Sequence, residues 1–335
     1  MGVWQSYRLR LARRRWRFRA VRKAKELRLV VNNTTKIGHK DVLVFSTFRN
    51  EMIRLPYFLK YYRDLGVKHF LMVDNNSDDG GREYLEQQPD VSLWTTPHSY
   101  LGARFGVDWL NYLQSKYGVD HWNLVVDPDE FFVYPYCDTR PLPALTDWLD
   151  SCAIRSFGAM LIDMYPKGPV GDTTYSAGQD PLEVAGWFDS GNYSIKRNWT
   201  NWNLWIQGGP RARVFFSDEP EKAPALNKVP LVKWQRRYAY SSSTHMVLPR
   251  GLNLVFDEDG GEKACGALLH TKFLNTFGEK ALEELERGQH YDGSAEYKAY
   301  AEGDASPDMW CKWSEKYINW RQLEILGLIS KGNWA

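Results

Sequence analysis

The first third of the chain alternates apolar, strand-like runs with helix-like segments, and this order constrains the fold more than any other feature. The strand-like runs are Asp41–Glu51, Lys68–Gly81, Val91–Thr96 and Leu124–Phe132. Apolar residues with helical spacing lie between them, over Leu55–Tyr62 and over Arg104–Tyr117. Strands that alternate with helices in this way predict a parallel sheet with helices on both faces.

Two aspartates follow the apolar part of the last strand-like run. The sequence LVVDPDEFF places Asp127 and Asp129 at or just beyond the carboxyl end of a strand, which is the edge where ligands bind in open α/β sheets. Two carboxylates there can hold a divalent cation, and the cation can in turn hold a diphosphate. The alternative is an acidic turn, since Asp and Pro are common turn residues. Two other strand-like runs also end in polar clusters, which favours a shared ligand site.

A set of short motifs extends this pattern along the chain. In order, they are RNE (Arg49–Glu51), VDNNSDDG (Val73–Gly80), VVDPDEFF (Val125–Phe132), GGPRARVF (Gly208–Phe215), NKVPLVKW (Asn227–Trp234), STHMV (Ser243–Val247) and GALLHTKF (Gly266–Phe273). With these motifs the chain resembles bacterial glycosyltransferase family 2-like proteins of the nucleotide-diphospho-sugar transferase fold, and it is similar to glycosyltransferase family 92. The resemblance covers roughly residues 41–300. It implies an α/β fold of the GT-A type: a mostly parallel sheet flanked by helices, a loop-rich acceptor region and C-terminal helices.

The resemblance also implies a metal site built on the DxD motif. Asp127 and Asp129 are the expected ligands of Mn²⁺ or Mg²⁺, and Glu130 is a further ligand, a neighbour of the ligands or a solvated carboxylate. His270 ends the apolar run GALLH, and its imidazole is expected to complete the metal shell. The alternative is that His270 has a purely structural role.

Further motif residues are expected to bind the nucleotide part of the donor. The residues matched to base or ribose are Arg49, Asn50, Glu51, Asp74, Asn75 and Asp79. The cations expected to neutralise phosphates are Arg211, Arg213 and Lys272, with surface cations as the alternative interpretation.

Transfer with inversion, which we expect here, requires a carboxylate that accepts the proton of the acceptor hydroxyl. The candidates are Asp163, at the end of a strand, and Asp189, among loops on the acceptor side. Each is alternatively a turn or cap residue. The Glu-Asp pair that follows the acceptor region in many family 2 enzymes has no counterpart here, so the resemblance does not identify the base.

Aromatic residues make up 15% of the chain, and most of them are expected in the core or at interfaces. Sugar rings often stack on aromatic side chains. The tryptophans of RNWTNWNLW are the candidates for an acceptor site, because polar residues separate them: Trp199, Trp202 and Trp205.

Positive charge is concentrated at the N-terminus. Residues 1–28 hold 11 Lys and Arg but one acid, Glu26, and the remainder holds 32 basic and 40 acidic residues. Within this segment apolar residues recur at three- or four-residue steps: Leu9, Ala12, Trp16, Ala20, Ala24 and Leu27. A helix with such a stripe suits the surface of an anionic membrane, so residues 8–28 are expected to bind one. The alternatives are a solvated disordered tail and a nucleic-acid-binding arm; no other basic motif supports nucleic acid.

The cysteines are widely spaced and form no Cys-x-x-Cys pair: Cys137, Cys152, Cys265 and Cys311. This spacing favours neither a zinc site nor a disulfide framework. Arginines interrupt any signal-peptide-like run, and no segment approaches the roughly 18 apolar residues of a membrane span. The expected location is therefore cytoplasmic, peripheral on the inner face of the cell membrane.

Composition and motif positions divide the chain into four segments. These are a basic amphipathic arm (1–36), a nucleotide-sugar-binding α/β half (37–140), an acceptor-side half of the same catalytic domain (141–276) and a C-terminal helical segment (277–335). Within the less regular part we expect a short helix over Thr146–Cys152 and a strand over Ala159–Tyr165.

The expected function is metal-dependent transfer of a sugar from a nucleotide-diphospho-sugar to a glycan or lipid-linked acceptor, in cell-surface polysaccharide or lipopolysaccharide synthesis. One alternative is a sugar nucleotidylyltransferase, which needs a Gly-rich phosphate loop after the first strand; the sequence there is STFRNE, without glycine. Another alternative is a non-catalytic, peripheral membrane or glycan-binding protein on a transferase fold, against which the intact Asp127 and Asp129 argue.

Overall fold

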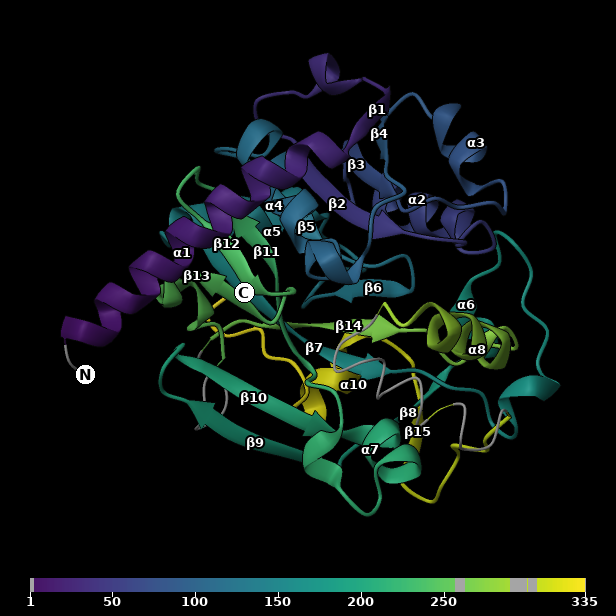
Figure 1. Cartoon of the computed structure of the whole chain (residues 1–335). Helices are drawn as coiled ribbons and strands as arrows, with labels where there is room; N and C mark the ends of the chain where they lie inside the picture. Colours follow the sequence, from purple (N-terminus) through teal and green to yellow (C-terminus); the bar gives the residue numbers. More distant parts are fainter. Residues whose placement is uncertain (1–2, 257–262, 290–299, 301–305, 335) are drawn as a thin grey trace.

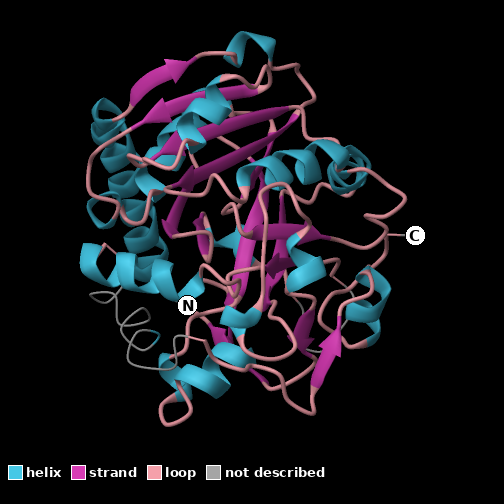
Figure 2. Ribbon diagram, turned by 90° about the vertical axis from the view of Figure 1, so that its right-hand side faces the viewer, coloured by secondary structure: helices cyan, strands magenta, loops and turns pink. Residues whose placement is uncertain are grey.

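The computed structural model describes residues 3–256, 263–289, 300 and 306–334. The helices are α1 (Val3–Lys23), α2 (Leu55–Asp64), α3 (Gly81–Glu86), α4 (Val107–Tyr117), α5 (Leu142–Ser151), α6 (Pro181–Val184), α7 (Gly209–Phe215), α8 (Phe277–Arg287) and α10 (Trp320–Ile325). Short 3₁₀ helices are η1 (Ala24–Glu26), η2 (Thr34–Lys36), η3 (Leu101–Ala103), η4 (Val170–Asp172), η5 (Pro220–Lys222) and η6 (Arg250–Asn253). Helices lie on both sides of the main sheet (Figures 1 and 2).

The main sheet runs through the whole molecule. Its strands are β1 (Arg28–Val31), β2 (Val42–Phe48), β3 (His69–Asp74), β4 (Val91–Thr95), β5 (Trp122–Val125), β6 (Glu130–Val133), β7 (Ser156–Asp163), β11 (Asn227–Lys233) and β14 (Gly266–His270). Within the described residues these nine strands lie in the order β1-β4-β3-β2-β5-β11-β7-β14-β6. Strands of the expected nucleotide-binding half and of the acceptor-side half therefore belong to one sheet, in which β11, β7 and β14 lie between β5 and β6.

Three smaller pairs of strands lie outside the main sheet in the described part of the chain. They are the hairpin of β9 (Tyr193–Asn198) and β10 (Asn203–Gly208), the pair of β12 (Ala239–Ser242) and β13 (Met246–Leu248), and the pair of β8 (Trp187–Asp189) and β15 (Ser314–Lys316). The hairpin lies below the main sheet in Figure 1.

The main sheet is mixed, whereas the sequence predicts a mostly parallel one. Four neighbouring pairs are parallel, all among β2, β3, β4, β5 and between β7 and β14. Four pairs are antiparallel, because β1, β11 and β6 run against their neighbours. Strand β6 runs backwards because only four residues separate it from β5, so it begins at the edge where β5 ends, and a parallel neighbour needs a longer crossover.

The core has two layers, one on each face of the sheet. In β2, Val42 and Val44 pack on the face covered by α2 and α5, while Leu43 and Phe45 pack on the face covered by α4. Every residue of β2 is buried, as expected for a central strand covered on both faces. Helix α2 begins beside Pro56, and its apolar stripe is buried as its spacing predicts.

The predicted order of the first third is confirmed by β2, α2, β3, α3, β4, α4 and β5. Asp127 and Asp129 lie just beyond the carboxyl end of β5, as predicted, and a further strand that was not predicted, β6, begins directly after them. The predicted strand over Ala159–Tyr165 corresponds to β7, and the predicted helix over Thr146–Cys152 begins earlier, as α5. Part of the expected C-terminal helical region, residues 290–299 and 301–305, lies outside the described residues.

The sequence does not predict β8 to β13, which fill much of the region expected to consist of loops. Strands β8, β12 and β13 have only three or four residues each, and Pro230 interrupts the strand pattern within β11. The basic arm also contributes to the fold, since β1 pairs with β4 at the edge of the sheet.

Helix α1 packs along α4 with the stripe that was expected to face a membrane. Ala20 is 3% exposed, and the Arg104 guanidinium lies 4.0 Å from the centre of the Trp16 ring. Arg19 contacts Asp108 of α4 at 2.6 Å. The stripe is therefore turned toward the protein and partly covered: Ala20 is buried, and the other stripe residues are half-buried. Among the described helices, none is long and apolar enough to cross a bilayer.

The sheet bends so that its β6 edge returns toward β5. The four residues between β5 and β6 extend over about 17 Å at most, less than the roughly 19 Å that four strand spacings need in a flat sheet. Helix α2 supports the returning strand: the Tyr62 hydroxyl donates to the Glu130 carbonyl at 2.7 Å and accepts from the Phe132 N–H at 3.1 Å. One buried hydroxyl thus holds β6 directly beneath the DxD motif.

Replacing Tyr62 by Phe should lower the free energy of unfolding by about 1–3 kcal/mol, because it leaves a buried N–H and a buried carbonyl without this partner. Urea denaturation followed by circular dichroism measures the effect. The matched control is Tyr7→Phe, since the Tyr7 side chain is exposed. Equal stability of the two variants would contradict this role of Tyr62.

Candidate functional site

A cavity of about 850 Å³ lies over the carboxyl ends of the central strands. Its floor is formed by Asp127–Glu130, by Thr47 and Phe48 at the end of β2, and by His270 at the end of β14. Strand β10 and helix α8 supply opposite walls. The cavity therefore lies at the sheet edge where the sequence predicted a ligand site.

The two aspartates of the DxD motif occupy different electrostatic environments. Asp127 is accessible from the cavity, but protein encloses it closely, and this desolvation together with the negative charge of Glu130 raises its pKa to about 7. Burial also acts to raise the pKa of Asp129, but the positive charges of His270, Arg54 and Lys272 hold it well below its ordinary value. The site therefore carries a carboxylate whose charge a bound cation would stabilise.

Register in the sheet sets the environment of His270. In β14, His270 lies beside Asp163 of β7 and opposite Glu130 of β6. Its Nδ1 is 2.7 Å from Asp163 Oδ1, and its Nε2 is 3.3 Å from Asp129 Oδ2. Burial acts to lower the pKa of His270, but these two carboxylates raise it to about 9.

Arg211 completes a chain of alternating charges. It lies on α7 and donates through Nε to Asp163 Oδ2 at 2.8 Å, with both side chains almost fully buried. Asp163 therefore lies behind His270, where it orients the imidazole toward the cavity. This is the arrangement in which a carboxylate fixes the tautomer of a metal-binding histidine. Asp163 itself does not line the cavity, so its position does not support the predicted role as a base.

Glu130 is held by a lysine from another strand. Lys228 of β11 contacts Glu130 Oε1 at 3.0 Å, with side chains 7% and 3% exposed. The other carboxylate oxygen accepts from the Asp127 N–H at 3.2 Å. Glu130 thus shapes the turn that carries Asp127 rather than facing solvent. Lys228 is not among the site residues predicted from the sequence, although a lysine within the apolar run NKVPLV was a usable signal.

Arg54 is a second functional residue that the sequence analysis missed. It is 2% exposed, lines the cavity and pairs with Glu51 at 2.8 Å. Burial acts to lower its pKa, but Glu51 and Asp129 raise it. A buried arginine beside the DxD motif adds positive charge where phosphates are expected.

The residues predicted to bind the nucleotide divide into two groups. Arg49, Glu51 and Asn75 line the cavity, as do Arg211 and Lys272. The remaining residues, which are not among those that line it, are Asn50, Asp74, Asp79 and Arg213.

Asp74 and Asp79 act on the backbone of neighbouring loops instead. Asp74 accepts from the Ser77 N–H at 2.8 Å and from the Thr95 hydroxyl at 2.9 Å. Asp79 accepts from the N–H groups of Met52 and Gly81. These two carboxylates hold the loops after β2 and β3 in place, because their side-chain oxygens are directed into the turns.

Helix α8 closes the nucleotide side of the cavity. Glu283 accepts from Arg49 at 3.4 Å and from Asn50 at 3.3 Å, and Lys280 pairs with Glu51. Arg287 donates to Asn75 Oδ1 at 3.3 Å. The RNE motif and Asn75 are thus already engaged by charged side chains of α8.

Asp189 lies apart from the cavity. It is 2% exposed, and it accepts from Arg213 at 3.0 Å and from the Tyr165 hydroxyl. Burial and then this hydrogen bond raise the pKa of Tyr165 well above its ordinary value. Arg213 and Asp189 form a structural pair between α7 and β8, so their positions do not support the predicted roles as phosphate ligand and base.

The acceptor-side wall carries one of the three predicted tryptophans. Trp205 lines the cavity near His245, with ring centres 6.3 Å apart. Trp199 is 71% exposed in the hairpin turn, and Trp202 lies under the Arg250 guanidinium. Trp199 and Trp202 belong to the turn between β9 and β10, whereas Trp205 lies on β10, which lines the cavity.

Backbone strain marks the wall next to α1. Arg104 and Phe105, which both line the cavity, have φ values of 53° and 59°, and Gly106 follows with 72°. A Cβ on Gly106 would approach Thr47 Oγ1 to 2.8 Å, so glycine is required there. Asp108 fixes Arg104 at 2.7 Å. Non-glycine residues in this conformation concentrate at functional sites.

The donor set has the chemistry of a divalent-cation site, although it is not a complete cage. Asp127, Asp129 and His270 all line the cavity, and His270 Nε2 lies 3.3 Å from Asp129 Oδ2. Among the described residues, no group of three or more His, Cys, Asp or Glu side chains is gathered as a metal site. Mg²⁺-type ions are commonly held by one or two carboxylates together with substrate phosphates, so these residues fit such an ion with its ligand.

Comparison with known proteins assigns no family. No protein-family model matches the chain, and no curated protein matches its sequence. Function is therefore inferred from the geometry and charge of the site itself.

Replacing Lys228 by Met should lower the free energy of unfolding by about 3–5 kcal/mol, because it leaves the buried Glu130 charge without its partner. Adding Glu130→Gln should restore much of the loss. The control is Lys222→Met, whose partner Glu219 is exposed and whose pair should contribute under about 1 kcal/mol. Urea denaturation of the unchanged protein, the two single variants and the double variant measures these free energies. Equal losses of stability in Lys228→Met and Lys222→Met would contradict the prediction.

Proposed function

We propose that this protein is a metal-dependent glycosyltransferase that moves a sugar from a nucleotide-diphospho-sugar to a glycan or lipid-linked acceptor. The observation that carries this proposal is the Asp127 carboxylate. It is accessible at the floor of a large cavity, its pKa is raised by enclosure and by Glu130, and cationic side chains surround it. A site with both signs of charge suits a cation bound together with a diphosphate.

The chain's own residues have distinct roles in this proposal. Asp127, Asp129 and His270 would hold Mn²⁺ or Mg²⁺, and the ion would supply Lewis-acid stabilisation of the diphosphate leaving group. Arg54 and Lys272 would add positive charge near the phosphates. Asp163 would keep His270 oriented through its Nδ1–H.

The two ends of the cavity suit different parts of the reactants. The end formed by Arg49, Asn75 and α8 is polar and charged, which suits a nucleoside. The opposite end carries Trp205, His245 and the serines of Ser241–Ser243, which suits a sugar ring with hydroxyl groups. We propose transfer with inversion, and a role in cell-surface polysaccharide or lipopolysaccharide synthesis.

Replacing Asp127 or Asp129 by Asn should abolish sugar transfer, because either change removes a carboxylate from the proposed metal site. The assay incubates the protein with a panel of nucleotide sugars and Mn²⁺ and measures donor hydrolysis and transfer. EDTA should abolish the same activity, and the exposed Asp64→Asn should retain it. Full activity in EDTA, or in both variants, would exclude the proposed metal site.

Replacing His270 by Ala should weaken Mn²⁺-dependent binding of a nucleoside diphosphate by about tenfold or more, as for other losses around a bound metal. Calorimetry measures the affinity without any turnover. His39→Ala changes an exposed histidine and serves as the control. An unchanged affinity in His270→Ala would leave His270 a structural role only.

A further inference from the structure

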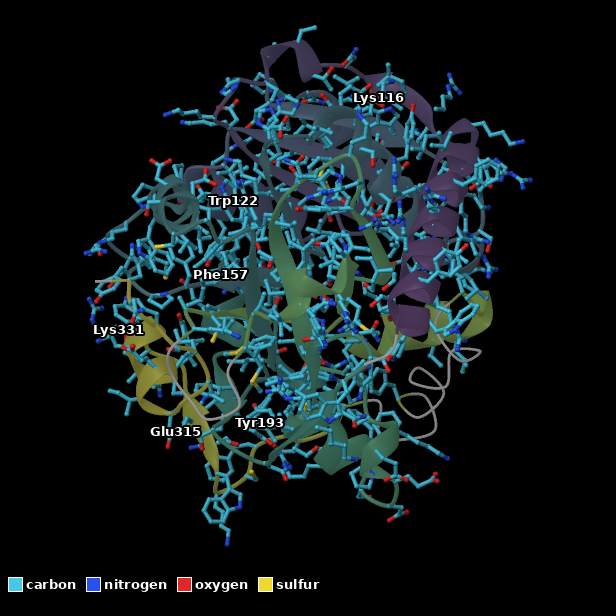
Figure 3. The ribbon with its side chains drawn as sticks, turned by 90° about the vertical axis from the view of Figure 1, so that its left-hand side faces the viewer. Lys116, Trp122, Phe157, Tyr193, Glu315 and Lys331 are labelled. Atoms are coloured by element: carbon cyan, nitrogen blue, oxygen red, sulfur yellow. The ribbon has the colours of Figure 1, made fainter. Side chains whose placement is uncertain are left out.

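Helix α1 has an outward face that differs from the stripe packed on α4. The stripe faces the protein, as Ala20 and Trp16 show. The opposite side, which we call the outward face, carries exposed apolar residues and exposed arginines at three- or four-residue steps. Its members are Trp4, Tyr7, Leu11, Phe18, Val21, Arg8, Arg10, Arg14, Arg15 and Arg22. Figure 3 shows α1 along one edge of the molecule, with side chains projecting away from the body.

The apolar members of this face are unusually exposed. Trp4 is 79% exposed, and Phe18 and Val21 are each 64% exposed. Trp4 and Tyr7 lie edge to face at one end of the helix, with ring centres 6.4 Å apart. Large side chains gathered on one helix face are characteristic of a surface that binds something apolar.

The charge on α1 has one sign. Its sequence contains nine Lys and Arg residues and no Asp or Glu. The cations also crowd one another: partial burial lowers the pKa of Arg13, and the neighbouring charges of Arg237 and Arg17 lower it further. The remainder of the chain has an excess of acids. An anionic partner is therefore attracted to α1 rather than to the protein surface as a whole.

We propose that the outward face of α1 binds the surface of an anionic lipid bilayer. A bilayer interface satisfies both features at once, because aromatic and aliphatic side chains enter the headgroup boundary while arginines contact anionic headgroups. Nucleic acid would account for the arginines but would leave Trp4, Phe18 and Val21 without a purpose. The helix packs against α4 and β12, so its outward face would lie along the bilayer surface and would not span it.

The position of α1 also brings the membrane close to the cavity. Arg104 stacks on Trp16 of α1 and lines the cavity. A lipid-linked acceptor bound at that wall would therefore remain near the bilayer. This consequence rests on the proposed glycosyltransferase function, whereas the binding of α1 to lipid does not.

The test is sedimentation of the full-length protein with vesicles of phosphatidylglycerol and phosphatidylcholine, compared with phosphatidylcholine alone. The intact protein should bind the anionic vesicles and not the neutral ones. The triple variant Arg10→Gln, Arg14→Gln, Arg22→Gln should bind about a hundredfold more weakly at low salt, since each cation near such a surface contributes roughly fivefold.

The matched control removes three exposed cations from other elements: Lys60→Gln, Arg155→Gln and Lys331→Gln. Lys331 lies on the side of the molecule away from α1 in Figure 3. The control should keep nearly full vesicle binding. All substituted side chains are exposed, so circular dichroism should show an unchanged fold, which deletion of a helix packed on α4 would not ensure.

The double variant Trp4→Ser, Phe18→Ser tests the apolar part independently. It should lower the binding that persists at high salt by about tenfold or more, because burial of apolar surface is not screened by ions. Three outcomes would overturn the proposal: no sedimentation of the intact protein with anionic vesicles, equal losses in the two triple variants, or tighter binding to duplex DNA than to the vesicles at physiological salt.

Discussion

The ion pair between His270 and the carboxylates on either side of it organises this structure. Asp163 contacts Nδ1 of the imidazole, and Asp129 contacts Nε2. Arg211 pairs with Asp163 on the side away from His270. Of the two carboxylates in this series of ion pairs, Asp129 lines the cavity. Buried charges are costly unless each has a partner, so the strands and the helix that carry these residues must meet in one arrangement. The need to pair these buried charges therefore fixes both the packing of these elements and the geometry of the site.

The second buried pair, Lys228 with Glu130, places the DxD turn within this frame. Strand β6 returns across the sheet because a short connection leaves it no other route, and Tyr62 of α2 holds it there. The turn between β5 and β6 is then enclosed by protein on all sides but one. Asp127 is accessible from the open side, and the enclosing protein leaves it poorly solvated. The proposed metal site depends on this combination.

The cavity walls come from elements far apart in the chain and differ in character. Helix α8 contributes charged groups to the nucleotide end, whereas the β9–β10 hairpin contributes Trp205 to the other end. Helix α1 is connected to the same wall through Arg104. Arg104 thus contacts both the proposed catalytic cavity and the inner stripe of α1, whose opposite face is proposed to bind lipid.

The sequence by itself determined the strand–helix order of the first third, the place of Asp127 and Asp129 at a strand end, and the concentration of cations in residues 1–28, because these depend on local spacing and composition. Only the tertiary structure decided which residues far apart in the sequence come into contact at the site. His270 reaches Asp163 through strand register, Lys228 reaches Glu130 across 98 positions, and Asp189 is turned toward Arg213. The sequence pattern identified the apolar stripe of α1 but not the surface against which it packs, because the hydrophobic effect does not specify a partner. In the structure the stripe faces α4, and the opposite face of α1 is exposed.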